Sequence, residues 1–247
     1  MSDAVFQKVI DSVKKSKITV GLFIMQHSGE PLADKNIASR IAMIKKGFPH
    51  SKIRLATNLS LLSRETAEQL LKSGLDKITI SLNTLSPEKY RTITGGLDYL
   101  QTMENINTLL ELNKKLNSNV AIFISVIQNN DNIGEIPAIR EFWKDRCDIR
   151  VIQHGHWIGK HLHEKTRYGS QKSFCSALYK SITILSNGDY ALCCCDAEGI
   201  VKKNIMTTPI EQCYFSGVYK EIRKLHRKRG LINKECADCI LTERELE

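Results

Sequence analysis

The sequence of 247 residues lacks the features that mark membrane, secreted and repeat proteins. No apolar run approaches the roughly 20 residues that a membrane-spanning helix needs. The start, Met1-Ser2-Asp3, has neither the basic region nor the apolar core of a secretory signal. Internal repeats and low-complexity tracts are also absent. We therefore expect a globular protein of the cytoplasm that has no membrane partner.

Several catalytic signatures are missing as well. The order of residues offers no Ser/His/Asp or Cys/His triad and no glycine-rich loop that would cradle a phosphate. No cysteine precedes Cys147, although the chain contains eight cysteines. In a reducing cytosol, cysteines that crowd toward one end of a chain indicate metal binding or redox work more than disulfides.

Basic residues outnumber acidic ones by 36 to 27, which gives a formal net charge of +9. This balance favours acidic partners without naming one. A late basic cluster, Arg223–Arg229, lies on a helical pattern. No aromatic-and-basic repeat accompanies it, so we interpret the cluster as a solvated helix face and expect no nucleic-acid partner. Steeply salt-dependent binding would indicate the alternative.

The first two thirds of the chain alternate between apolar runs of strand length and amphipathic helical patterns. This alternation predicts an α/β fold with a parallel sheet. The predicted strands are Ile18–Met25, Ile53–Thr57, Lys77–Leu82, Val120–Ile127 and Ile149–Gln153. The predicted helices cover about 2–17, 36–46, 63–74, 99–116 and 136–144, and a further short helix begins at Ser86-Pro87. We expect the first apolar run to be buried on both faces, as parallel strands are.

The character of the sequence changes after Gln153, where a polar stretch with four histidines begins. Beyond it, Asn187-Gly188 predicts a tight two-residue hairpin, and Ile210–Arg229 predicts one helix. We therefore predict two domains, residues 1–160 and 170–247. The second is a small cysteine-rich α+β extension.

Polar residues follow three successive predicted strands. Gly29-Glu30-Pro31 follows the first, Thr57-Asn58 ends the second, and Ser81 lies at the end of the third. Each set is also what an ordinary turn or helix cap would use. Because adjacent parallel strands end at one edge of a sheet, a shared ligand pocket there is an equal alternative.

Four cysteines have the spacing of a metal site. Cys236 and Cys239 form a Cys-x-x-Cys pair, and Cys175 and Cys193 precede it, the latter beside the predicted hairpin. Four thiolates suit an iron–sulfur cluster or Zn²⁺. The side chains of Cys193, Cys194 and Cys195 cannot all point the same way on a strand, because side chains alternate between faces. We select Cys193, with Cys194 or Cys195 as the alternative ligand. Cys147 and Cys213 fit the alternative of cysteines without a metal.

The order of these elements resembles the radical S-adenosylmethionine (radical SAM) family. Gly29-Glu30-Pro31-Leu32, Thr57-Asn58 and Leu75–Leu82 before Ser86-Pro87-Glu88 carry the resemblance. It implies a partial (β/α) barrel of radical SAM type over about residues 18–153. It also implies that the SAM amino group binds at Gly29, Glu30 and Pro31, and that Asn58, Ser81 and Ser125 contact its ribose and carboxylate. The family generates a 5′-deoxyadenosyl radical to modify a peptide, protein or small molecule.

The cysteine set resembles the SPASM-type extension of this family. Gly188-x4-Cys193 matches its Gly-x4-Cys element, which implies one auxiliary [4Fe-4S] cluster at Cys175, Cys193, Cys236 and Cys239. The family's Cys-x3-Cys-x2-Cys triplet, which holds the catalytic cluster, has no match here. We expect either a truncated enzyme or a homologue that has lost radical chemistry. The alternative from another class is a non-catalytic interaction module that binds zinc or an iron–sulfur cluster.

Overall fold

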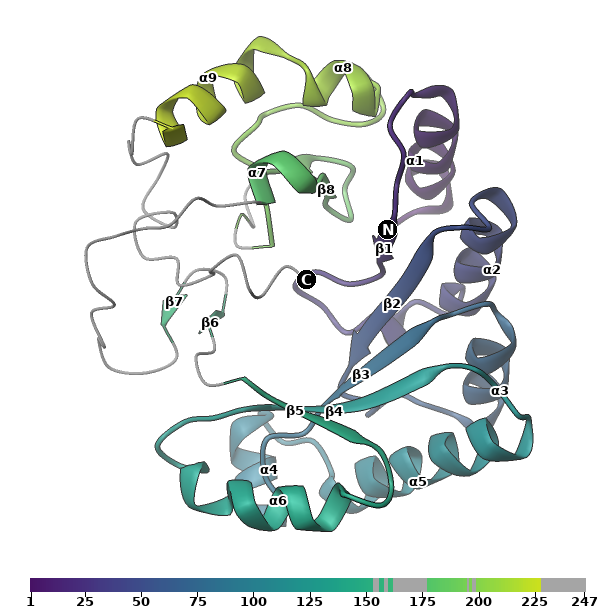
Figure 1. Ribbon diagram of the computed structural model, residues 1–247, viewed down its shortest axis with the longest axis vertical. Coiled ribbons are helices and arrows are strands. Elements are labelled where there is room, and N and C mark those ends of the chain that lie inside the picture. Colours follow the sequence, from purple (N-terminus) through teal and green to yellow (C-terminus); the bar gives the residue numbers. More distant parts are fainter. Residues whose placement is uncertain (153–155, 158–159, 162–176, 195, 197–198, 228–247) are drawn as a thin grey trace. The chain divides into compact units, whose positions relative to one another are not determined.

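The computed structural model describes residues 1–152, 156–157, 160–161, 177–194, 196 and 199–227, and the chain divides into two compact units (Figure 1). One unit is Val20–His154, and the other combines Met1–Thr19 with Gly155–Glu247. Within the described residues, no helix is both long and apolar enough to cross a membrane.

The first of these units, Val20–His154, contains the predicted parallel sheet. Its five strands are paired in chain order and all run parallel. They are β1 (Leu22–Ile24), β2 (Lys52–Thr57), β3 (Lys77–Ser81), β4 (Ala121–Ile127) and β5 (Asp148–Ile152). The predicted α/β fold is confirmed, and the last four strands lie within one residue of their predicted bounds.

The helices of this unit lie along one side of the sheet (Figure 1). They are α2 (Ile37–Gly47), α3 (Arg64–Lys72), α4 (Pro87–Ile93), α5 (Tyr99–Lys115) and α6 (Ile136–Trp143), with short 3₁₀ turns η1 (Pro31–Ala33) and η2 (Ile133–Glu135). Side-chain oxygens of Ser63, Ser86 and Asp98 accept hydrogen bonds from backbone N–H groups in the first turns of α3, α4 and α5. Such caps satisfy N–H groups that a helix leaves without partners.

The first strand is shorter and more exposed than predicted. β1 spans three residues, and its Leu22 and Ile24 side chains are 40% and 45% exposed. The expectation of burial on both faces is therefore wrong for this strand. β1 is at the edge of the sheet and pairs only with β2 among the described strands, so it lacks there the second neighbouring strand that a central parallel strand has.

The two faces of the sheet differ in chemistry. Residues that share a register row point to the same face, and successive residues alternate. The face under the helices is apolar and fully buried at its centre, where the exposed fractions of Ile53, Leu55, Ile78, Ile80, Ile124 and Val126 are zero. Each such side chain contributes about 1.5–3 kcal/mol through burial. The opposite face, here called the open face, carries Arg54, Lys77, Thr79, Ser81 and Ser125.

The other unit contains α1 (Asp3–Lys15), α7 (Ala177–Lys180), α8 (Ile210–Tyr214), α9 (Gly217–Arg227) and two small antiparallel sheets. One sheet pairs β6 (His156–Trp157) with β7 (Lys160–His161), and the other pairs β8 (Thr183–Ile184) with β9 (Tyr190–Ala191). Ser12 on α1 accepts a hydrogen bond from the Ile210 N–H at 2.8 Å. This bond joins the N-terminal helix to α8.

The hairpin and the long helix differ from their predictions in detail. Asn187-Gly188 does lie in the β8–β9 hairpin, but the loop has three residues, because Leu185 pairs with Asp189. Gly188 adopts φ +93°, as the last residue of such a loop requires. The predicted helix Ile210–Arg229 is divided into α8 and α9, and Ser216 Oγ accepts a hydrogen bond from the Tyr219 N–H at the start of α9.

Candidate functional site

Glu30 joins the ends of the first two strands. One carboxylate oxygen accepts hydrogen bonds from Thr57 Oγ1 (2.5 Å) and the Leu32 N–H (3.0 Å), and the other accepts one from the Asn58 N–H (2.9 Å). Hydrogen bonds to a charged acceptor are the stronger kind in proteins. The carboxylate thereby fixes the loop after β1 against the end of β2.

The residues beside Glu30 leave room for a ligand. A Cβ atom added to Gly29 would meet no atom within 4 Å. Pro31 begins η1, where its fixed φ suits a helical turn, and Leu32 behind it is buried. The chain thus exposes backbone at Gly29 and anchors the following residues in the protein.

Asn58 lies beside Glu30 and continues the same edge of the sheet. Its side-chain oxygen accepts a hydrogen bond from the Ser60 N–H at 2.9 Å, which forms a tight turn. The next residue, Leu59, is fully buried with φ +59°, a conformation that is uncommon outside glycine. Thr57 Oγ1 and Asn105 Nδ2 hold its N–H and C=O. Protein contacts therefore enforce this strained turn, which directly follows Asn58.

Ser81 and Ser125 lie side by side. They are register partners at the ends of β3 and β4, with Ser81 exposed and Ser125 8% exposed. Asn58 comes one position after Thr57, the register partner of Ile80, so it is level with Ser81. The structure thus brings Glu30 together with Asn58 and Ser81 together with Ser125. Their roles toward SAM stay predictions.

The sequence interpretation missed Arg150. This residue is the register partner of Ser125 on β5 and extends the row of polar side chains by a guanidinium group. A basic residue inside the apolar run Ile149–Gln153 was the available signal. Arg150 is exposed.

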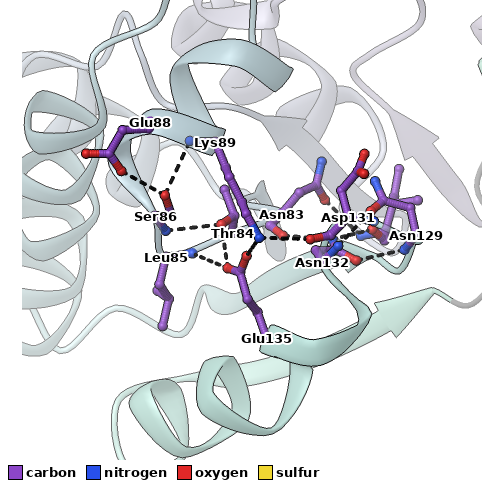
Figure 2. Close-up of polar contacts among 11 residues, drawn as sticks. Asn83, Thr84, Leu85, Ser86, Glu88, Lys89, Asn129, Asp131, Asn132 and Glu135 are labelled. Carbon is purple, nitrogen blue, oxygen red and sulfur yellow. Dashed lines mark hydrogen bonds and ion pairs between the residues drawn. The ribbon is translucent and has the colours of Figure 1, made fainter.

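Figure 2 shows a polar network that fixes the loops after β3 and β4. Asn132 is fully buried, and its amide nitrogen donates to the backbone oxygens of Asn83 (2.8 Å) and Ile127 (2.9 Å). Its amide oxygen accepts from the Asn129 N–H at 2.7 Å. The side chain therefore uses both amide hydrogens and its oxygen to hold the two loops.

Glu135 adds a second link in the same network (Figure 2). Its carboxylate accepts hydrogen bonds from Thr84 Oγ1 (2.5 Å), the Leu85 N–H (3.3 Å) and Lys89 Nζ (2.6 Å). Burial alone would raise the pKa of Glu135, but the bonds from Lys89, Thr84 and Leu85 lower that pKa overall. Glu135 is therefore an ionised bridge between η2 and the start of α4. It steadies the loops that follow Ser81 and Ser125.

Cys193 and Cys194 lie after β9 rather than on it, in a turn that surrounds Asp196. The buried Asp196 carboxylate accepts hydrogen bonds from the N–H groups of Leu192, Gly199 and Ile200 at 2.9–3.2 Å. The argument from alternating strand faces, by which Cys193 was selected, therefore does not apply. Cys193 itself is half-buried and stays a predicted ligand.

The other predicted ligands, Cys175, Cys236 and Cys239, lie outside the described residues. Within the described part of the chain, no group of three His, Cys, Asp or Glu side chains is placed to hold a metal ion. Burial raises the pKa of Cys147 and that of Cys213 to about 11 each. Both thiols are therefore protonated at neutral pH, and the absence of a metal at these two cysteines stays a prediction.

Arg223, the first residue of the late basic cluster, has a structural role. Its side chain is 9% exposed, donates to the Leu178 and Tyr214 backbone oxygens, and stacks on the Tyr214 ring at 4.1 Å. It was predicted as part of a solvated helix face, and that part of the prediction is wrong. Lys224 on the same helix is exposed.

A parallel sheet with helices along one side and polar groups at the carboxyl ends of its strands defines an α/β fold of the class whose members place their ligand sites at that edge. The model of the radical SAM superfamily matches residues 3–142, and that of an iron–sulfur cluster-binding SPASM domain matches residues 175–240. The chain belongs to the radical SAM superfamily and carries a C-terminal SPASM domain.

Relatives and solved structures agree with this assignment. The chain is 34% identical over 148 residues to a GTP 3′,8-cyclase of Rhizobium leguminosarum bv. trifolii, a match that covers 59% of this chain and 38% of the relative. A GTP 3′,8-cyclase of Caulobacter vibrioides is 31% identical over 129 residues, covering 51% and 35%. The chain thus matches well under half the length of these two curated relatives.

Two solved structures share the fold at low sequence identity. Native anSMEcpe with bound AdoMet aligns with TM-score 0.65 and 14% identity, covering 97% of this chain and 78% of that one. BtrN in complex with AdoMet and 2-DOIA aligns with TM-score 0.56 and 15% identity, covering 98% and 81%. At these identities the likeness establishes the fold.

Proposed function

We propose that this chain binds SAM at the carboxyl edge of its sheet and holds one auxiliary iron–sulfur cluster in its SPASM domain. Radical chemistry on a small molecule or peptide is proposed for a full-length form that also holds the catalytic cluster. The observation that carries the proposal is the Glu30 carboxylate, which fixes the loop after β1 to Thr57 and Asn58 while the space beside Gly29 stays open. A rigid loop with exposed backbone suits a polar ligand.

The residues at this edge fit the groups that SAM presents. Backbone at Gly29–Pro31 would face the amino group, while the hydroxyls of Ser81 and Ser125 and the amide of Asn58 would meet ribose and carboxylate. The row of Ser81 and Ser125 lies next to Arg150, whose guanidinium favours an anionic group. Reductive cleavage of bound SAM supplies the 5′-deoxyadenosyl radical in this family.

The 247 residues contain no Cys-x3-Cys-x2-Cys triplet, because no cysteine precedes Cys147. We therefore expect this chain, as it stands, to bind SAM without cleaving it. The substrate class follows from the relatives. The curated ones are named for GTP, and an anSMEcpe structure contains a peptide, so both small molecules and peptides are candidates.

SAM binding by the 247-residue chain tests the first part of the proposal. Equilibrium dialysis with labelled SAM should show saturable binding, and Glu30→Ala should weaken it at least about tenfold, since loss of a charged hydrogen-bond acceptor typically costs about 1.5–3 kcal/mol. Glu104→Ala is the matched control, because Glu104 is an exposed carboxylate on α5. Equal binding by wild type and Glu30→Ala would refute the assigned site.

Metal analysis after anaerobic reconstitution with iron and sulfide tests the second part. We expect about four irons per chain and a brown protein, as one [4Fe-4S] cluster on four thiolates requires. Bound zinc without sulfide would instead support the alternative of a zinc-binding interaction module. Dithionite and SAM should yield no 5′-deoxyadenosine, and its formation would refute the expectation that the chain does not cleave SAM.

A further inference from the structure

A ribbon of two short strands, β6 and β7, pairs two histidines. The strands are antiparallel, and His156 on β6 is the direct register partner of His161 on β7 (Figure 1). Direct partners on an antiparallel pair share one face, and their Cβ atoms lie about 4.5–5.5 Å apart. The fold thus places two residues that carry an imidazole at one register position on one face of the ribbon.

The length of the connection between the strands fixes this pairing. Two residues separate the paired Trp157 and Lys160 in the chain, and in a hairpin the length of the connection sets the register. A slip of one residue would put the two histidines on opposite faces. The sequence alone leaves the pairing open, because histidines at alternate positions of a polar stretch need not come together.

Two imidazoles from neighbouring strands suit a transition-metal ion. Zinc binds histidine nitrogen at about 2.0–2.1 Å, and imidazole is among the ligands that zinc favours. A two-stranded hairpin by itself is at best marginally stable in water. β6 and β7 have two residues each and belong to no larger sheet among the described strands. An ion held by one residue from each strand would therefore stabilise the ribbon, since metal binding adds to folding free energy.

We propose that His156 and His161 bind one zinc ion across the β6–β7 ribbon. The site uses none of the four cysteines assigned to the auxiliary cluster, and it does not depend on the proposed function. Two histidines supply half of the four ligands that zinc usually takes, so two positions remain for other groups, water included. His154 and His163 complete a His-x-His pair on either side in the sequence and lie outside the described residues.

Zinc counts on the full 247-residue chain test the proposal. The chain is first reconstituted with iron and sulfide, so that a cluster can occupy the cysteines, and is then dialysed against zinc chloride. We expect His156→Ala and His161→Ala each to weaken the binding of one zinc at least tenfold, since even the loss of a group that supports a metal ligand typically costs about 10–100-fold. His50→Ala is the matched control and should bind zinc as the wild type does, because His50 is exposed and lies in the other unit.

A variant that moves one histidine to the other face tests the register itself. The double variant Lys160→His/His161→Ala keeps the number of histidines, but position 160 is the partner of Trp157 and lies on the opposite face. Its zinc affinity should be as low as that of His161→Ala. An affinity equal to that of the wild type would refute the pairing of two histidines at one ion.

Hydrogen exchange of the wild type with and without zinc supplies a measurement that needs no variant. Zinc should slow exchange in the peptide that contains β6 and β7, because the ion joins the two strands. The proposal fails if zinc leaves this peptide unchanged, if the single-histidine variants bind zinc as the wild type does, or if His50→Ala binds as weakly as they do. A chain that takes up no iron or sulfide but still loses one zinc in His161→Ala would contradict the cluster hypothesis alone.

Discussion

Glu30 and Asp196 use the same device over different distances along the chain. Each carboxylate accepts hydrogen bonds from backbone N–H groups and thereby fixes a loop beside a predicted ligand-binding residue. Glu30 reaches Thr57 and Asn58, which lie 27 and 28 residues away. The N–H groups that Asp196 reaches among the described residues all lie within four residues of it.

This difference suggests different roles for the two carboxylates, ligand binding for Glu30 and local stability for Asp196. The long-range contacts of Glu30 set the spacing between two strand ends, so its loss should change how a ligand fits between them. The local contacts of Asp196 set the shape of one loop, and the residue is 6% exposed, so its loss should mainly affect folding. Variants in both regions can test this distinction.

The largest effect is expected for Asp196→Ala. The change leaves the buried N–H groups of Leu192 and Gly199 and the part-buried N–H of Ile200 without their charged acceptor, so the free energy of unfolding should fall by about 2–4 kcal/mol. Urea denaturation followed by circular dichroism measures it. Glu221→Ala, which removes an exposed carboxylate on α9, should change stability by less than about 1 kcal/mol. Equal losses in both variants would show that the Asp196 contacts do not order the loop.

Thr57→Val should have the next largest effect and lower the free energy of unfolding by about 2 kcal/mol. Thr57 is 3% exposed, and its hydroxyl donates to Glu30 and accepts from the Leu59 N–H. Valine fills the space but removes this partner of the Leu59 N–H and one of the three hydrogen bonds to the Glu30 carboxylate. Thr57→Ser keeps the hydroxyl and should restore most of the SAM affinity that Thr57→Val loses. If valine lowers stability without changing SAM binding, the long-range contact of Glu30 has no functional part.

The sequence was sufficient to predict the parallel sheet and the residues that cap two of the helices. Runs such as Val120–Ile127 are apolar over most of the length of a strand, and Ser63 and Ser86 are cap residues directly before helical patterns, so these signals are local. The exposure of Ile24 depends on the position of β1 at the sheet edge, which no local pattern reveals. The division between α8 and α9 likewise depends on Ser216 as a helix cap inside an amphipathic stretch.

The sequence could predict which residues belong to the candidate site, but it could not predict the hydrogen bonds between them. Family resemblance identified Glu30 and Asn58, yet the bonds from Thr57 and Asn58 to the Glu30 carboxylate join segments far apart in the chain. Arg150 could be recognised only through its register with Ser125. Arg223 looked like a surface charge because a sequence does not show the tyrosines that surround a buried guanidinium.

Glu135→Gln should have a smaller effect, which depends on pH. The folded pKa of Glu135 lies below its ordinary value of 4.5, so its contribution is fully present above that pH and is lost as the pH falls through the folded pKa. At neutral pH we expect a loss of about 1 kcal/mol, since the carboxylate is partly exposed. Urea denaturation at a series of pH values below 5 should show the two proteins converging. Glu141→Gln, at an exposed site on α6, should show no such convergence.

Gly29→Ala should have the smallest effect on stability of these variants, but it should clearly weaken SAM binding. A methyl group at Gly29 meets no atom within 4 Å, so the free energy of unfolding should stay within about 0.5 kcal/mol of the wild type. The same methyl group would occupy the space where the SAM amino group is proposed to approach the backbone, so SAM affinity in equilibrium dialysis should fall. Gly21→Ala is the control, because a Cβ there also meets nothing within 4 Å, but Gly21 precedes β1 and lies away from the carboxyl edge. Unchanged SAM binding in Gly29→Ala would mean that the open space beside Gly29 is not part of the site, and that the loop held by Glu30 serves only to join two strands.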